Sequence, residues 1–249
     1  ADLQIFVENL KTEMTIWGER LEKPKLATVF FGGGTPSLLP PGALMGIKDR
    51  LERSFTLPES FEFTFEANPD SVGTKEYLSA LLRLGVNRLS LGFQSLDDES
   101  LRLLGRPHTS QQALQTYMLA RDLGFRNISL DLIWGLPGQR QTTWIKELKA
   151  VTDLRPEHLS CYNLTVEPDT PLEEMVRSGQ VKLPTEKDQS NMFIYGADFL
   201  ESVGYFQYEI SNFSRLGLHS RHNMGYWEGR DYLGLGPSAV STLNGRRWR

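Results

Sequence analysis

The chain has 249 residues, of which 39% are hydrophobic and 23% charged, proportions that are ordinary for a globular protein. Its formal net charge is −4, and apart from Arg246, Arg247 and Arg249 it has no basic stripe, so we expect no nucleic-acid partner. No apolar run is long enough to cross a bilayer, and no secretory signal is visible at the start. The single cysteine, Cys161, suits a reducing compartment, and we expect a cytoplasmic protein.

Both ends of the sequence indicate a longer polypeptide. The chain begins without Met, directly inside a helical pattern, and it stops at NGRRWR. We therefore expect further residues beyond both ends.

Apolar and polar periods alternate regularly up to about residue 170. They predict strands at 26–31, 61–66, 88–94, 128–134 and 158–166, and helices at 2–22, 41–54, 74–84, 97–123 (a pair) and 142–153. Alternation of strands and helices with short loops is typical of βαβ units and a parallel sheet. The fold class that we expect is α/β, a partial (β/α) TIM-like barrel over residues 1–170.

The pattern changes after this barrel. A short helix at 168–179 precedes a longer helix at 186–204, and a strand-like segment at 206–213 leads to a loop that holds His222. We expect residues 171–249 to form a C-terminal α+β extension.

The predicted strands have one polar face. In the second strand, Phe61, Phe63 and Phe65 alternate with Glu62, Thr64 and Glu66. The interior of an ordinary barrel is packed with branched apolar side chains. Because the apolar face must meet the helices, the polar face should look inward, which predicts a barrel filled by water or by a ligand.

Unusual residues occur where the predicted strands end. Each has an ordinary explanation, since glycines form turns and Glu or Gln can precede a helix. Asp131 is harder to explain, because Asp is depleted in strands. Ligand sites in barrels form at the carboxyl ends of the strands, so the shared placement favours a binding site. The set comprises Gly32, Gly33, Gly34, Thr35, Glu66, Gln94, Asp131 and Thr165.

These residue types suit a polar, zwitterionic ligand that carries a sugar. Glycine backbone can approach an amino group or a carboxylate closely, and carboxylates accept hydrogen bonds from ribose hydroxyls. Arg106 in LGRPHT has two equally favoured interpretations. It forms a bidentate pair with a ligand carboxylate, or it is a solvated arginine at a helix end.

Eight segments together identify a family resemblance. They are FFGGGTPSLL, FEANPDS, NRLSLGFQSLDD, LLGRPHT, DLIWGLPGQ, LSCYNLTVEPDTPL, YEISNFS and YLGLGPSA. In this order they resemble the radical S-adenosylmethionine (SAM) proteins related to oxygen-independent coproporphyrinogen III dehydrogenase, and among these the HemW-type haem chaperones. The resemblance covers about residues 26–240.

The resemblance implies a partial barrel with an open polar interior, here without its first strand. It also implies contacts to SAM. The methionine end of SAM would contact Gly32, Gly33, Gly34 and Thr35. Glu66 would bond the ribose, and Arg106 would bind a carboxylate. Gln94, Asp131 and Thr165 would line the same cavity.

We do not expect this chain to bind the family's [4Fe–4S] cluster. Three cysteines spaced CxxxCxxC hold it in the family, because cluster iron is bound by thiolates, and this chain has no cysteine in that loop. Cys161 lies in the last barrel strand and is expected to be a small buried hydrophobic residue. As given, the polypeptide should not cleave SAM reductively.

The stretch HNMGYW at 222–227 has two interpretations. Asn223 and Gly225 favour a turn, with Trp227 packed on the barrel, and the residues alone favour this structural role. The haem-chaperone branch carries H-N-x-x-Y-W, however, and neutral imidazole is a common ligand of haem iron. With the resemblance we expect His222 to bind haem iron and Tyr226 and Trp227 to cover a porphyrin face.

Two functions follow from the resemblance. The first is a carrier that binds haem and delivers it to apo-haemoproteins, with a transient membrane-protein client or a homodimer among the possible partners. The second is an enzyme that decarboxylates coproporphyrinogen III propionates oxidatively, using the radical that SAM supplies. HNMGYW favours the carrier, so the sequence leans away from an enzyme.

Overall fold

The computed structural model describes residues 2–249, which divide into two compact units. Among these, unit 1 comprises residues 2–66, 76–88 and 220–249, and unit 2 comprises residues 67–75 and 89–219. The expected boundary between a barrel and an extension at residue 170 stays a prediction.

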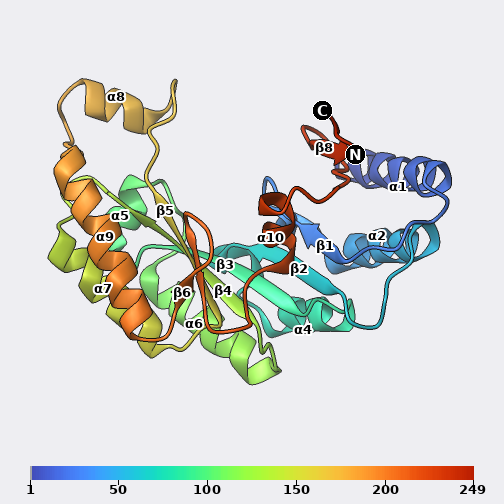
Figure 1. Ribbon diagram of the computed structural model, residues 1–249, viewed down its shortest axis with the longest axis horizontal. Coiled ribbons are helices and arrows are strands. Elements are labelled where there is room, and N and C mark those ends of the chain that lie inside the picture. The colour runs from blue at the N-terminus through green and yellow to red at the C-terminus, as the bar shows by residue number, and fades with distance from the viewer. Residues whose placement is uncertain (1) are drawn as a thin grey trace. The chain divides into compact units, whose positions relative to one another are not determined.

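Unit 1 combines a helical pair, a parallel strand pair and a terminal hairpin (Figure 1). In the parallel pair, Thr28 lies opposite Glu62 and Phe31 opposite Phe65. The elements are α1 (Asp2–Arg20), β1 (Thr28–Phe31), the 3-10 helix η1 (Pro36–Leu38), α2 (Pro41–Ser54), β2 (Glu62–Ala67), α4 (Lys75–Arg83), α10 (Arg221–Trp227), β8 (Ser241–Leu243) and β9 (Arg246–Trp248).

Helices α1 and α2 pack closely because a glycine lies at their contact. A Cβ atom at Gly18 would be 2.5 Å from the carbonyl oxygen of Ser54. Trp17 of α1 stacks on Trp248 of β9 with ring centroids 5.4 Å apart. The N-terminal helix and the C-terminal hairpin therefore belong to one packed unit.

Unit 2 contains a sheet with the strand order β3-β4-β5-β7-β6. Strands β3, β4 and β5 are parallel, whereas β7 is antiparallel to both β5 and β6. Helices α7 and α9 lie side by side (Figure 1). The elements are α3 (Pro69–Val72), β3 (Arg88–Gln94), α5 (Asp98–Leu103), α6 (Ser110–Leu123), β4 (Ile128–Trp134), α7 (Gln141–Asp153), β5 (His158–Asn163), α8 (Pro171–Arg177), α9 (Glu186–Ser202), β6 (Phe206–Gln207) and β7 (Asn212–Ser214).

The predicted strand–helix alternation is confirmed up to β5. Local capping sets several helix ends: Thr109 and Gln112 form a capping box at the start of α6, and Gly124 closes it with φ +110°. Strand β5 ends at Asn163 rather than at 166. Residues 164–166 lie outside the ladder, so Thr165 belongs to a loop.

Two expectations for the C-terminal part are wrong. The sequence predicts one strand over residues 206–213, but β6 and β7 form a hairpin in which Tyr208 N–H donates to the Asn212 carbonyl at 3.1 Å. Residues 221–227 were expected as a loop, but they form α10. The Ser220 hydroxyl accepts from Asn223 N–H, and this N-cap starts a helix where the Asn and Gly pattern indicated a turn.

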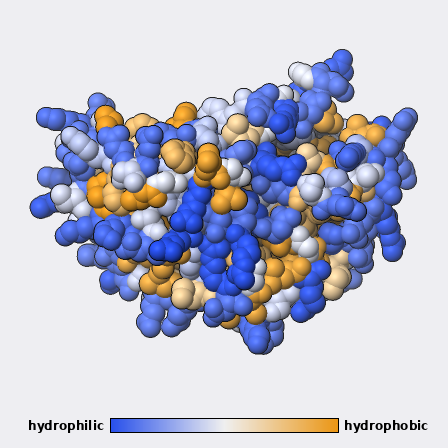
Figure 2. Space-filling view, turned by 60° about the horizontal axis from the view of Figure 1, so that its bottom comes forward, coloured by the Kyte–Doolittle hydropathy of each residue, from blue (hydrophilic) through white to orange (hydrophobic). Residues whose placement is uncertain are grey.

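No helix among residues 2–249 is long and apolar enough to span a bilayer. Figure 2 shows one face of the molecule, on which apolar residues form separate groups among hydrophilic ones.

Candidate functional site

Helix α10 is fixed to strand β2 by one carboxylate. Glu62 is only 7% exposed, and its Oε2 accepts the backbone N–H of Arg221 at 2.9 Å. Its Oε1 accepts the backbone N–H of His222 at 2.9 Å and the Ser220 hydroxyl at 3.4 Å. The first N–H groups of a helix lack intrahelical partners and carry partial positive charge. The carboxylate therefore satisfies these donors and sets where His222 lies.

The imidazole of His222 has a hydrogen-bond partner at each nitrogen. Thr28 Oγ1 on β1 is 2.8 Å from Nδ1, and the Tyr226 hydroxyl, one helical turn ahead, is 3.0 Å from Nε2. Phe30 stacks on the ring with centroids 4.8 Å apart and planes 17° apart. Three contacts from two elements thus define the position and the plane of the imidazole.

The electrostatic surroundings keep this pair neutral. Burial lowers the pKa of His222, Glu62 opposes that shift and Arg88 adds to it. Burial raises the pKa of the Tyr226 phenol, and the neighbouring Tyr232 adds to the rise. At neutral pH a neutral imidazole therefore faces a protonated phenol.

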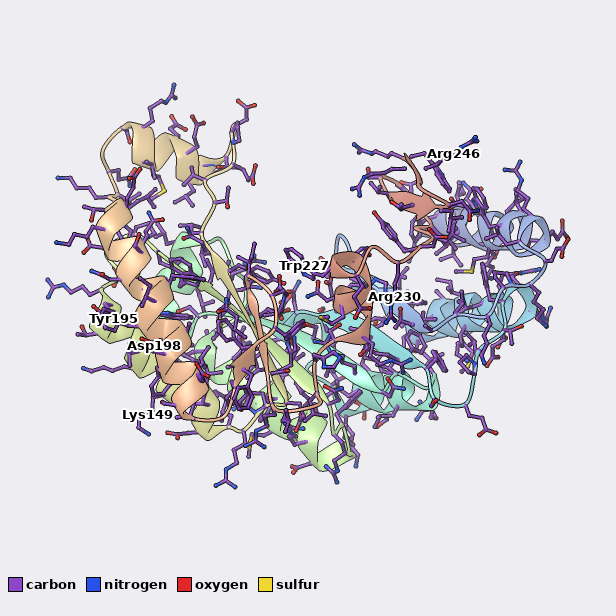
Figure 3. The ribbon with its side chains drawn as sticks, viewed as in Figure 1. Lys149, Tyr195, Asp198, Trp227, Arg230 and Arg246 are labelled. Atoms are coloured by element: carbon purple, nitrogen blue, oxygen red, sulfur yellow. The ribbon has the colours of Figure 1, made fainter. Side chains whose placement is uncertain are left out.

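Aromatic side chains extend from the histidine to the surface. Tyr226 and Trp227 are 47% and 54% exposed, and Figure 3 labels Trp227 at the end of α10. Tyr226 packs edge-on against Tyr232 at 4.6 Å, and Arg247 Nη1 donates to the Tyr232 hydroxyl at 2.9 Å. An imidazole beside exposed aromatic rings has the chemistry to receive a flat apolar molecule that contains a metal.

The glycine loop and Glu66 form a second group in unit 1. Gly33 N–H donates to Glu66 Oε2 at 3.2 Å. A Cβ atom at Gly32 would be 2.7 Å from the same oxygen, whereas a Cβ atom at Gly34 would meet nothing within 4 Å. Thr35 precedes η1 and makes no side-chain cap to it. The loop thus presents glycine backbone to the Glu66 carboxylate, and the space beside Gly34 is open.

In unit 2, the end of strand β3 is irregular. Its pairing with β4 shifts register between Gly92 and Gln94, and Gln94 has φ +65°, a left-handed conformation that is uncommon for a residue with a side chain. A Cβ atom at Gly92 would be 2.7 Å from Gln94 Nε2 and 2.8 Å from Asn68 Oδ1. Gly92 thus makes room for two amide side chains. Strain of this kind is concentrated at functional sites.

Asp131 on β4 is held by serines from its own and the neighbouring strand. The Ser90 hydroxyl lies 3.1 and 3.0 Å from its two oxygens, and the Ser129 hydroxyl lies 3.2 Å from Oδ1. Ser129 also contacts His158 Nδ1 at 2.8 Å, and the Tyr208 hydroxyl lies 2.7 Å from His158 Nε2. These contacts fix the carboxylate within the sheet.

Arg106 and Thr165 lie in loops of unit 2. Arg106 is half-buried between α5 and α6, and its Nε is buried without a hydrogen-bond partner among residues 2–249. Thr165 is exposed after β5. A buried guanidinium N–H without a partner is costly, and an anionic ligand group would satisfy it.

The donor set fits SAM but does not fit an iron–sulfur cluster. In unit 1, glycine backbone at 32–34 and the Glu66 carboxylate suit the amino-acid and ribose parts of SAM. In unit 2, the buried Arg106 Nε, which has no hydrogen-bond partner among residues 2–249, suits an anionic group. Cys161 is buried on β5, and burial raises the pKa of its thiol. Within the described part of the chain, no three His, Cys, Asp or Glu side chains form a group that could hold a metal ion.

Sequence reasoning missed several residues that build this site. The sequence pattern places Glu62 only on a polar strand face, and it does not distinguish Thr28 or Phe30 from other strand residues. The signal for Glu62 was present, because it shares its strand face with Glu66. No local signal connects Thr28 with His222, because 194 positions separate them.

Comparison with known proteins identifies a family and several relatives. The radical SAM superfamily model matches residues 12–151. The chain is 37% identical to the heme chaperone HemW of Bacillus subtilis, covering 97% of this chain and 64% of that protein. It is 41% identical to the mitochondrial radical S-adenosyl methionine domain-containing protein 1 of Danio rerio, covering 86% and 48%. The chain thus spans less than two thirds of the length of these relatives.

The fold of the chain is similar to that of a solved structure. Coproporphyrinogen III oxidase (HemN) from Escherichia coli superposes with a TM-score of 0.82 at 25% identity, covering 98% of this chain and 58% of that one. The expected fold class, α/β with a parallel sheet of the partial-barrel type, is thereby confirmed. With a family model that matches more than half of its residues, this chain belongs to the radical SAM superfamily.

Proposed function

We propose that the chain is part of a haem chaperone, in which His222 binds haem iron and the surrounding aromatic residues hold the porphyrin before transfer to apo-haemoproteins. The observation that carries this proposal is the surroundings of His222. Phe30 fixes the plane of its imidazole, and its Nε2 lies beside the exposed Tyr226. Burial lowers the pKa of His222, which favours the neutral form. Neutral imidazole is the form that donates a lone pair to haem iron.

The exposed rings supply the second part of a haem site. Tyr226 and Trp227 are each about half exposed, so a porphyrin would bury apolar area that now faces water. Helix α10 presents both rings, and Glu62 fixes that helix. The relatives named heme chaperone HemW support the same assignment.

We propose a SAM site on the residues that fit it. In unit 1, Gly32, Gly33, Gly34 and Thr35 would bind the methionine end and Glu66 the ribose. In unit 2, the residues that we propose to bind SAM are Arg106, through a carboxylate, and Gln94, Asp131 and Thr165. When bound, SAM supplies an adenosyl group on a sulfonium centre. We derive no cleavage step, because the thiolates for a [4Fe–4S] cluster are absent from these 249 residues.

Recipients and location follow from the proposed role. Apo-haemoproteins would accept the haem, a membrane protein would be a transient client, and the assembly would be a homodimer. We propose a cytoplasmic protein, because the single cysteine suits a reducing compartment. The Danio rerio relative is named mitochondrial.

The test is a haem titration of the chain followed by absorbance, with His222→Ala as the variant. We expect the wild-type chain to bind haem stoichiometrically with the Soret band of a histidine complex, and the variant to lose it. His219→Ala is the matched control, because His219 is an exposed histidine three positions earlier. Equal binding by wild type and His222→Ala, with both folded by circular dichroism, would overturn the proposal.

A second candidate function rests on the structural match to coproporphyrinogen III oxidase. It would be oxidative decarboxylation of coproporphyrinogen III propionates by the full-length protein with its cluster. We expect no product from coproporphyrinogen under reducing, anaerobic conditions with SAM. Measurable turnover would move this enzyme to first place.

A further inference from the structure

Each ring nitrogen of His222 has a hydroxyl partner, Thr28 at Nδ1 and Tyr226 at Nε2. The inference from these contacts rests on the proposed haem site and concerns which nitrogen binds the iron. A neutral histidine has one N–H and one lone pair, and the partners of its nitrogens decide which nitrogen carries which. Here both partners are hydroxyl groups, which can donate or accept. The two arrangements are therefore distinguished by the surroundings of each nitrogen.

Nδ1 faces the sheet. Its partner, Thr28 Oγ1, lies 2.8 Å away at the start of β1, where Thr28 pairs with Glu62. Nε2 faces the exposed end of the helix, where the Tyr226 hydroxyl lies 3.0 Å away on a side chain that is 47% exposed. Because Nδ1 is bonded to a side chain of β1, whereas the partner of Nε2 is on a half-exposed side chain, we assign iron to Nε2. The ligand lone pair must therefore lie on Nε2, and the proton must lie on Nδ1.

Tyr226 occupies the position that iron would take. Its ring meets the imidazole edge-on, with centroids 5.1 Å apart and planes 89° apart. The same ring leans on Tyr232. In the haem-free chain, the Tyr226 phenol that donates to Nε2 of His222 gives the lone pair a hydrogen-bond partner and blocks access to it.

We infer that Thr28 is a positioning residue that accepts a hydrogen bond from Nδ1–H of His222 and thereby keeps the lone pair on Nε2, and that Tyr226 covers this lone pair until haem iron replaces it. The exchange breaks the hydrogen bond from Tyr226 to Nε2 and forms the iron–Nε2 bond. No electron is transferred, and the Nδ1 proton stays in place. In other proteins, metal-binding histidines are oriented in the same way, by a hydrogen-bond partner at the ring nitrogen that does not bind the metal.

The first test uses haem affinity. Thr28→Val removes the hydroxyl at nearly constant shape, and we expect its haem dissociation constant to rise about 10-fold or more, the usual effect of losing such a partner. Thr28→Ser keeps the hydroxyl and should bind like wild type. Tyr226→Phe removes the cover, and its dissociation constant should fall about 2- to 10-fold, the equivalent of one neutral hydrogen bond. Tyr195→Phe on α9, an exposed tyrosine (Figure 3), is the matched control.

The second test needs no haem. Nitrogen-15 NMR of the His222 ring in the haem-free chain reports the tautomer, and we expect Nδ1–H in wild type and Thr28→Ser but a mixture in Thr28→Val. An Nε2–H tautomer in wild type overturns the inference. Unchanged haem affinity in both Thr28→Val and Tyr226→Phe, with a wild type that binds haem through His222, also overturns it.

The two proposals fail in different ways. A wild-type chain that binds no haem overturns the haem site and, with it, the exchange at Nε2. In that case NMR still decides whether Thr28 sets the tautomer. Binding that persists in His222→Ala likewise contradicts the haem site and leaves the NMR result to decide the role of Thr28.

Discussion

Glu62 Oε1 accepts the backbone N–H of His222 at 2.9 Å, so the position of the candidate iron ligand depends on a carboxylate 160 residues away in the sequence. The same carboxylate also accepts from Arg221 N–H. Helix α10 has only seven residues, and isolated helices of this length are unstable in water. Its structure therefore depends on this anchor.

Glu62→Ala should destabilise the chain and impair haem binding. Removing the carboxylate leaves two backbone donors without their acceptor, and we expect the free energy of unfolding to fall by about 2–4 kcal/mol. Urea denaturation measures this change. Glu59→Ala is the control, because Glu59 is exposed. Equal stability of the two variants would show that α10 is held by other contacts.

The close contact of α1 and α2 predicts opposite effects for two glycine substitutions. Gly18→Ala places a Cβ atom 2.5 Å from the Ser54 carbonyl oxygen, so the helices must separate, at a cost of about 1–3 kcal/mol. Gly42→Ala in α2 meets nothing within 4 Å and should raise stability by up to about 1 kcal/mol. Thermal unfolding compares them. A Gly18→Ala variant as stable as Gly42→Ala would contradict the packing.

The ion pair between Arg121 and Glu157 should contribute far more than a surface pair. Its N–O distance is 2.7 Å and its side chains are 19% and 15% exposed. Glu157 Oε2 also accepts from Ile128 N–H. Arg121→Met leaves this carboxylate without its cation, and we expect a loss of about 2–4 kcal/mol.

A double-mutant cycle with Glu157→Gln tests this coupling, because the two losses should not add. The control is Lys149→Met, whose partner Asp153 lies one helical turn away. Both side chains of that pair are 67% exposed, and Figure 3 labels Lys149 on α7. Its loss should stay below about 0.5 kcal/mol. Additive losses at Arg121 and Glu157 would rule out the coupling.

Glu147 predicts a pH dependence of stability. Burial raises its pKa, although hydrogen bonds from the Ser95 hydroxyl and Leu96 N–H oppose the rise. The folded chain therefore binds this proton more tightly than the unfolded chain does. The stabilising contribution is complete below the ordinary pKa of 4.5 and is lost as pH rises through the folded-state pKa.

Glu147→Gln cannot ionise, so it should gain stability relative to wild type as pH rises from 4.5 toward neutral. The relative gain should be on the order of 1 kcal/mol. Urea denaturation at several pH values measures it, with the exposed Glu201→Gln as control. A difference between wild type and Glu147→Gln that does not change with pH would contradict the raised pKa.

The sequence predicted the strand and helix order because hydrophobic periodicity is a local property of each segment. Its prediction of a binding site at the strand ends, with Glu66, Gln94 and Asp131, stays a prediction, and Asp131 lies in the middle of β4 rather than at its end. Sequence prediction failed where short-range preference and tertiary contact disagree. Residues 221–227 have turn-forming Asn and Gly, yet they form a helix, because Ser220 caps it and Glu62 holds its first N–H groups.

Local sequence by itself therefore determined the α/β class and the chemical character of the candidate ligand residues. Only the tertiary structure decided that Thr28, Phe30 and Tyr226 surround His222. Hydrogen bonds and ring contacts act over a few ångströms, whereas Thr28 and His222 are 194 positions apart. The folded chain brings them together through the pairing of β1 with β2 and the anchoring of α10 on Glu62, and no periodicity in the sequence records that contact.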